Sequence, residues 1–222
     1  MISSGVEFTT AATNLVNAII TAVLICVVLR SVKSEVRRSV WSVFLGLFFV
    51  ICILGAVIHG FVFDDSVRKV LWLVLYGIMA FMIGSFVVAI VYETRGESGL
   101  KRVVKINAVL AVAFVISMVI VSFFLEYTFT VFIIYCACYL LVIIGLILSA
   151  IRQKAYCGWF LAGVGFMVVG SILQTVKTIL LHIGPMEFNY NAVYHVFTIL
   201  YILCLFVGVM RAEKQTLYCG QS

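Results

Sequence analysis

The three histidines of this sequence offer its clearest chemistry. They are His59, His182 and His195, and the carboxylates Asp64 and Asp65 follow shortly after the first of them. Imidazole nitrogen and carboxylate oxygen form the ligand set of a catalytic zinc, whose open position holds a water acidified toward neutral pH. The sequence therefore predicts a zinc site in which the histidines are ligands and Asp64 or Asp65 is the general base or a further ligand.

Further polar residues recur at helical spacing near these histidines. Glu7, Thr10 and Asn14 fall at positions i, i+3 and i+7, so they share one face of a helix. Asn191 lies four residues before His195, and these two also share a face. A carboxylate or amide beside a metal-bound imidazole fixes its tautomer, a role open to Asn14, Asn191 or Asp64. The residues that we expect to line a polar pocket are Glu7, Thr10, Asn14, Tyr190 and Asn191.

Each histidine also has a simpler interpretation. A histidine near the end of a membrane helix is commonly a hydrogen-bonded residue of the interface. Ionisable groups below the membrane surface are costly, which favours a functional role for His59 and His195 over His182. A polar stripe with spacings of four, three and four is formed by Ser171, Thr175, Thr178 and His182. This stripe predicts either hydrogen bonds between helices or the wall of a cavity open to the outside.

Membrane-spanning helices are the elements that must position these residues. The chain is 65% hydrophobic and 11% charged, whereas about a quarter of the residues in a soluble domain are charged. Its apolar runs continue far past the roughly ten alternating residues of a barrel strand. We expect an all-α bundle of seven transmembrane helices in one domain, residues 1–222. The runs lie near 9–29, 40–63, 70–92, 103–124, 129–150, 159–181 and 190–210.

The distribution of charge predicts the orientation. Most Lys and Arg residues fall in the first, third and fifth loops and the tail, which places the N-terminus outside and the C-terminus in the cytoplasm of a multi-pass cell-membrane protein. The net charge of +6 then reflects topology and indicates no nucleic-acid partner. The outer side holds a surplus of acid beside the histidines, which suits a cation. Its acidic residues are Glu7, Asp64, Asp65, Glu126 and Glu187.

Helix packing and interface residues can also be predicted. Small residues in the sixth run allow a neighbouring helix to approach closely; they include Gly158, Gly163, Gly165 and Gly170. Trp41, Trp72 and Trp159 lie near the ends of their runs and are expected to anchor them at the membrane interface.

Several classes of membrane protein fit poorly. The seventh run contains no lysine for a retinal Schiff base. The "YETRG" at residues 92–96 resembles the acid–arginine pair of rhodopsin-like receptors, but the seventh run has no N-P-x-x-Y. The sequence lacks the two repeated halves that are typical of many transporters. It also lacks the ring of like charges that is typical of a channel.

The motifs around His59 and His195 resemble two families of seven-helix membrane proteins. One is the CREST superfamily of hydrolases, which includes alkaline ceramidases and the progestin and adipoQ receptors. The other is an uncharacterised bacterial family with the patterns E-x-T-T-x-x-T-D, G-x-x-H-G and F-N-H-N-D-L-Y-H. Here these read "EFTTAATN" at 7–14, "GAVIHG" at 55–60 and "FNYNAVYH" at 188–195. The resemblance implies a zinc site at the helix ends and hydrolysis of lipid amides or esters.

The sequence departs from these patterns at several positions. Asn14 and Ala192 stand where the bacterial family has aspartate, and Tyr190 stands where it has histidine. Gly55 replaces a serine of the CREST pattern, and Asn191 replaces a histidine. Two hypotheses therefore remain. The first is a zinc-dependent hydrolase with a lipid substrate, and the alternative is a non-catalytic membrane sensor or binding protein that takes a lipid headgroup or a small polar ligand.

Overall fold

The chain forms seven long helices and one short hairpin. A computed structural model describes residues 5–124, 128–183 and 186–219. All seven helices are long and apolar enough to cross a bilayer, so the predicted seven-helix membrane bundle is confirmed. The helices are α1 Gly5–Ser31, α2 Glu35–Gly60, α3 Asp65–Arg95, α4 Leu100–Phe124, α5 Thr128–Ala150, α6 Cys157–Val176 and α7 Tyr190–Cys219.

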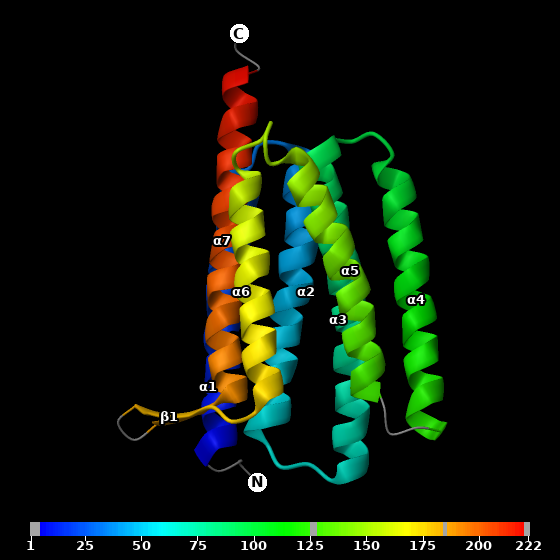
Figure 1. Ribbon diagram of the computed structural model, residues 1–222, viewed down its shortest axis with the longest axis vertical. Coiled ribbons are helices and arrows are strands. Elements are labelled where there is room, and N and C mark those ends of the chain that lie inside the picture. The colour runs from blue at the N-terminus through cyan, green and yellow to red at the C-terminus, as the bar shows by residue number, and fades with distance from the viewer. Residues whose placement is uncertain (1–4, 125–127, 184–185, 220–222) are drawn as a thin grey trace.

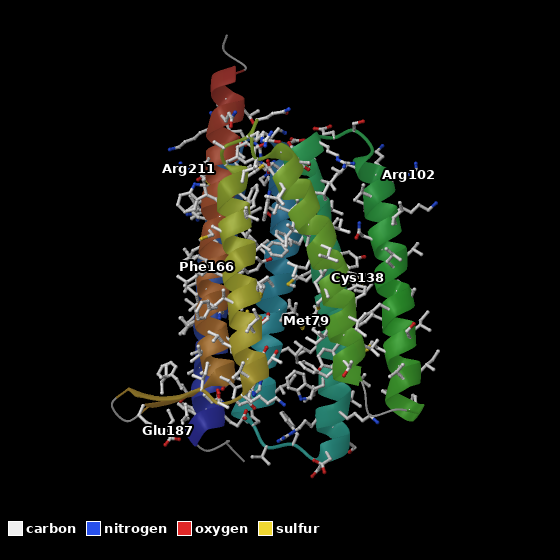
Figure 2. The ribbon with its side chains drawn as sticks, in the orientation of Figure 1. Met79, Arg102, Cys138, Phe166, Glu187 and Arg211 are labelled. Atoms are coloured by element: carbon white, nitrogen blue, oxygen red, sulfur yellow. The ribbon has the colours of Figure 1, made fainter. Side chains whose placement is uncertain are left out.

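The two termini lie at opposite ends of the bundle (Figure 1). We call these ends the N-terminal end and the C-terminal end. Figure 2 places Glu187 at the N-terminal end and Arg102 and Arg211 toward the C-terminal end. Helix α7 continues to Cys219, past the predicted boundary at residue 210, and Figure 1 shows it projecting beyond the other helices.

The segment after α6 differs from the prediction. Helix α6 ends at Val176, because Lys177 takes the left-handed conformation with φ of 57°, which interrupts the helix. Strands β1 Leu180–Ile183 and β2 Met186–Asn189 then pair antiparallel. The predicted helix to residue 181 is therefore wrong. The prediction of one helical polar stripe from Ser171 to His182 is also wrong, because Thr178 and His182 lie outside the helix.

Two hydrophobic clusters share α3. The larger one joins α3 with α1, α2, α5, α6 and α7, and the smaller one lies between α3, α4 and α5. Trp41 lies within the larger cluster at 1% exposure and stacks on Phe160, with the ring centroids 5.4 Å apart. The expectation that Trp41 anchors the membrane interface is therefore wrong, since its ring belongs to the core.

Helix α6 packs closely on α7 at its glycines. A Cβ atom at Gly170 would lie 2.8 Å from Phe197 Cβ, and one at Gly163 would lie 3.1 Å from Leu205 Cδ2. Gly165 has nothing within 4 Å of such an atom. The predicted close approach therefore depends on Gly163 and Gly170, which lie seven residues apart on one face of α6.

A pair of alanine substitutions tests this packing. Gly170→Ala should lower the thermal midpoint in detergent, because Phe197 must shift and overpacking of this kind costs about 1–3 kcal/mol. Gly165→Ala is the matched control on the same helix and should leave the midpoint unchanged or slightly higher, since alanine favours the helix. Equal midpoints for the two variants would contradict the close α6–α7 contact.

Candidate functional site: a buried polar seam at the N-terminal end

Asn14 and His195 meet across the contact between α1 and α7. Asn14 Nδ2 lies 2.9 Å from His195 Nε2 and 3.2 Å from the carbonyl oxygen of Thr10. Asn14 is 3% exposed. Both side chains therefore satisfy part of their hydrogen-bonding capacity inside the protein, as a membrane interior requires.

These contacts determine the tautomer of His195. The Asn14 amide nitrogen donates to the Thr10 carbonyl, so reversing the amide would place two acceptor oxygens together. The same nitrogen therefore donates to His195 Nε2, which must present a lone pair. It follows that the ring of His195 is neutral and carries its proton on Nδ1.

Polar contacts continue deeper along the same two helices. Asn17 Nδ2 lies 2.9 Å from the His195 carbonyl oxygen and 3.0 Å from Thr198 Oγ1. Thr21 Oγ1 donates to the Asn17 carbonyl at 2.7 Å. Asn17, Thr21 and Thr198 are all buried. The sequence prediction missed these three residues, although Asn17 and Thr21 continue the spacing of Thr10 and Asn14 on the same helical face.

Asn189 links this region to the hairpin. Its Oδ1 accepts a hydrogen bond from Thr10 Oγ1 at 3.1 Å and another from the backbone N–H of Ala192 at 2.9 Å. Because Asn189 immediately precedes α7, the second contact is an N-cap. We define the polar seam as the buried or partly buried side chains Thr10, Asn14, Asn17, Thr21, Asn189, His195 and Thr198.

Gly55 allows α2 to pack against this seam. A Cβ atom at Gly55 would lie 2.9 Å from Asn14 Oδ1, closer than ordinary contacts allow. The position at which a serine is expected from the CREST pattern thus has no room for a side chain beside Asn14.

Glu7 and His59 form a second contact nearer the surface. Glu7 Oε2 lies 2.6 Å from His59 Nδ1, and the side chains are 49% and 13% exposed. The imidazole also packs edge-on against Trp72, with the ring centroids 5.7 Å apart. The Glu7–His59 contact joins α1 to α2, the Trp72 contact adds α3, and the Glu7 carboxylate is accessible to solvent.

The remaining candidate residues lie elsewhere. His182 is on β1, 62% exposed at its side chain, with Nδ1 3.8 Å from Glu187 Oε1. Asn191 Oδ1 accepts a hydrogen bond from Gln174 at 3.0 Å. Partly buried Tyr190 begins α7.

The two predicted catalytic carboxylates lie at the start of α3. Asp64 precedes α3 and Asp65 begins it; both are exposed. Glu126 lies outside the described residues.

The predicted zinc site requires several ligand side chains to converge on one point. Among the described residues, no group of three or more His, Cys, Asp or Glu side chains is placed to hold a metal ion. His195 Nε2 already accepts from Asn14, and His59 Nδ1 already contacts Glu7. A catalytic zinc generally needs three protein ligands, so the residues in this conformation do not fit one.

A second polar cluster lies at the C-terminal end, and the sequence prediction missed it. Arg37 on α2 contacts Glu93 on α3 at 2.9 Å and Glu213 on α7 at 2.6 Å. The exposed fractions of the three side chains are 6%, 0% and 5%. We call these three residues the Arg37 cluster. Glu93 belongs to the "YETRG" stretch, which therefore has a structural partner on a different helix.

Other hydrogen bonds complete the Arg37 cluster. Trp41 Nε1 donates to Glu93 Oε1 at 3.0 Å. The backbone N–H groups of Lys33 and Ser34 donate to Glu213 Oε1 at 2.8 and 3.3 Å. The buried charges are thus paired and hydrogen-bonded, which is what makes their burial tolerable.

Substitutions in the Arg37 cluster test its contribution to the free energy of unfolding. Arg37→Met should lower the free energy of unfolding by about 3–5 kcal/mol, because it leaves two buried carboxylates unpaired. Arg38→Met is the control. Within the described part of the chain, the one side-chain hydrogen bond of Arg38 is a 3.5 Å contact with the Val32 carbonyl, so this substitution should change stability by about 0.5 kcal/mol or less. Adding Glu93→Gln and Glu213→Gln to Arg37→Met should recover part of the loss. Equal thermal midpoints for Arg37→Met and Arg38→Met would contradict the assignment.

Metal analysis tests the conclusion about zinc. We expect protein purified in detergent without chelator to hold no stoichiometric zinc, because His195 Nε2 accepts from Asn14 and no three potential ligands converge among the described residues. His59→Ala and His195→Ala should give the same metal content as the parent chain. Near-stoichiometric zinc that disappears in both variants would restore the hydrolase hypothesis.

Comparisons with known proteins give a family without an activity. No curated protein and no solved structure matches the chain. A family model described as a family of unknown function, DUF6962, matches residues 9–214. That range contains the whole polar seam and the Arg37 cluster, and it leaves out Glu7. Because the match covers most of the sequence, the chain belongs to the DUF6962 family.

Proposed function

We propose that this protein is a non-catalytic sensor of the cell membrane. It takes a lipid headgroup or a small polar ligand at the N-terminal end, which faces outward, and changes conformation at the cytoplasmic C-terminal end. The observation that carries the proposal is that the same helices are joined by polar contacts at both ends. Helices α1, α2 and α7 meet around Asn14 and His59, and α2 and α7 meet again at Arg37.

The N-terminal contacts are suited to rearrangement. Hydrogen bonds between membrane helices contribute about 0.6 kcal/mol on average, so a ligand that offers better partners to Glu7 or His59 can displace them. Glu7 is 49% exposed and is therefore accessible from solution. A ligand changes the conformation only through a difference in its affinity for the two states, and exchange of these contacts provides such a difference.

The C-terminal contacts are suited to report the change. Glu213 on α7 accepts hydrogen bonds from Arg37 and from the backbone of Lys33 and Ser34, which connect α1 to α2. Any shift of α7 along its axis or about it alters these bonds. A buried charge without its partner is costly. A small displacement of Glu213 would therefore change the free energy of the Arg37 cluster strongly.

The hydrolase hypothesis has less support. It rests on the resemblance to the CREST superfamily, and its catalytic step needs a metal that the described side chains are not arranged to hold. Asp64 and Asp65 are exposed and form no ion pair with a histidine among the described residues. The sensor needs neither group for its mechanism.

Hydrogen exchange measures whether the two ends are coupled. In His59→Gln, loss of the Glu7 pair should speed exchange of the Lys33 and Ser34 amides, which are protected by Glu213, roughly fivefold, the low end of allosteric coupling. These amides lie about 40 Å from Glu7 along α1. Mass spectrometry of peptides covering residues 31–38 gives the rates.

Asp64→Asn is the matched control, because Asp64 lies at the same end and contacts neither the polar seam nor His59 among the described residues. It should leave the Lys33 and Ser34 amides unchanged. A response of His59→Gln confined to the N-terminal end would show that the ends are independent and would overturn the sensor proposal.

A further inference from the structure

A hollow of about 200 Å³ lies on α3 near the N-terminal end. It is lined by Lys69, Trp72, Leu73 and Tyr76, which share one helical face. None of these residues belongs to the polar seam. Complete small-molecule pockets usually have volumes of about 300–1,000 Å³, so this hollow holds only part of a ligand and leaves the rest outside.

The charge in the hollow comes from Lys69. Lys69 Nζ donates to the carbonyl oxygen of Ser122 on α4 at 2.6 Å, which holds the ammonium group between the two helices. An ammonium has three donors, so two remain for a ligand. Among the described residues, no carboxylate lies within ion-pair distance of Lys69. The group is therefore available to an anion and repels a cation.

Beyond Lys69, the residues that line the hollow are aromatic or aliphatic. Trp72 and Tyr76 lie with ring centroids 5.7 Å apart, and Tyr76 stacks on Phe132 of α5 at 4.9 Å. Phe132 belongs to the smaller hydrophobic cluster between α3, α4 and α5. Lys69 and Tyr76 are seven residues apart, or about 10 Å along the helix. The hollow thus runs from a cation at the end of the helix to aromatic rings within the span.

We propose that this hollow binds an anionic lipid with a single chain, whose headgroup phosphate contacts Lys69 and whose chain lies along Trp72, Leu73 and Tyr76. A lipid fits the small volume, because the remainder of its chain stays in the bilayer. This inference deepens the proposed sensor function and rests on it for its consequence, since the Trp72 ring that lines the hollow also packs against His59. The lipid would act on the Glu7–His59 pair through that ring.

Binding of lysophosphatidylglycerol tests the site. Native mass spectrometry of the full chain in detergent gives its dissociation constant, with lysophosphatidylcholine as the neutral comparison. Lys69→Met should weaken lysophosphatidylglycerol binding at least fivefold, and Lys69→Arg should retain it. Arg68→Met is the matched control, because Arg68 is an exposed neighbouring cation that does not line the hollow.

The outcomes separate this proposal from others. Equal weakening by Lys69→Met and Arg68→Met, or none by either, would overturn the site. Leu73→Trp, which fills the hollow without changing charge, should also weaken binding, and unchanged affinity there would overturn the placement of the chain. Thermal midpoints close to that of the parent chain confirm that the variants are folded.

Coupling is read separately from binding. Lysophosphatidylglycerol should change exchange of the Lys33 and Ser34 amides in the parent chain and leave it unchanged in Lys69→Met. Binding without any change in exchange would support the lipid site and contradict the sensor function. Absence of Lys69-dependent binding, together with coupled exchange in His59→Gln, would contradict the lipid site and leave the sensor function standing.

Discussion

A polar side chain inside a bilayer must find its partner within the protein, and the arrangement of this bundle depends on that constraint. Asn14 and Asn17 on α1 find theirs on α7, at the side chain and the carbonyl oxygen of His195. Arg37 finds its partners on α3 and α7. Lipid provides no alternative partners for these groups, so the contacts determine which faces of the helices meet. Hydrophobic packing is less selective for particular helix faces, because an apolar side chain is almost equally stable against lipid tails and against another helix.

The two ends of the bundle differ in the strength of these contacts. The polar seam consists of neutral hydrogen bonds, each of modest strength, with the solvent-accessible Glu7–His59 pair at its outer edge. The Arg37 cluster consists of buried charges, and loss of one partner is expensive. The contacts at the N-terminal end can therefore be rearranged at low cost, whereas a change in the Arg37 cluster carries a large free-energy cost. This asymmetry supports the proposed sensor function, which requires no metal at the histidines.

The fold could be predicted from composition, but the hairpin could not. Runs of more than twenty apolar residues identify membrane helices because only helices satisfy their own backbone there. After Val176 the chain remains apolar through Leu180 and Leu181, and hydropathy does not distinguish a short strand from the end of a helix. Lys177 ends α6 through its backbone conformation, which leaves no mark in the composition. The predicted place of His182 on a helical polar stripe is wrong for the same reason, because His182 lies on β1.

Part of the candidate site could be predicted from the sequence. The spacing of Glu7, Thr10 and Asn14 predicts a shared face, and that face does contact the other elements. Which residue each one meets depends on the rotation of every helix about its axis, which packing decides. The ion pairs of Arg37 could not be predicted, because the sequence does not distinguish a buried basic residue near a helix end from a solvated one.

The protonation state of the His195 ring is the most direct test of this account. Nitrogen-15 solid-state NMR of protein labelled at histidine, with His59→Gln and His182→Gln to assign the signals, identifies the protonated ring atom at neutral pH. We predict a neutral ring with its proton on Nδ1 and an unprotonated Nε2 that accepts a hydrogen bond from Asn14. A proton on Nε2, a doubly protonated ring, or a metal bound at Nε2 would contradict it.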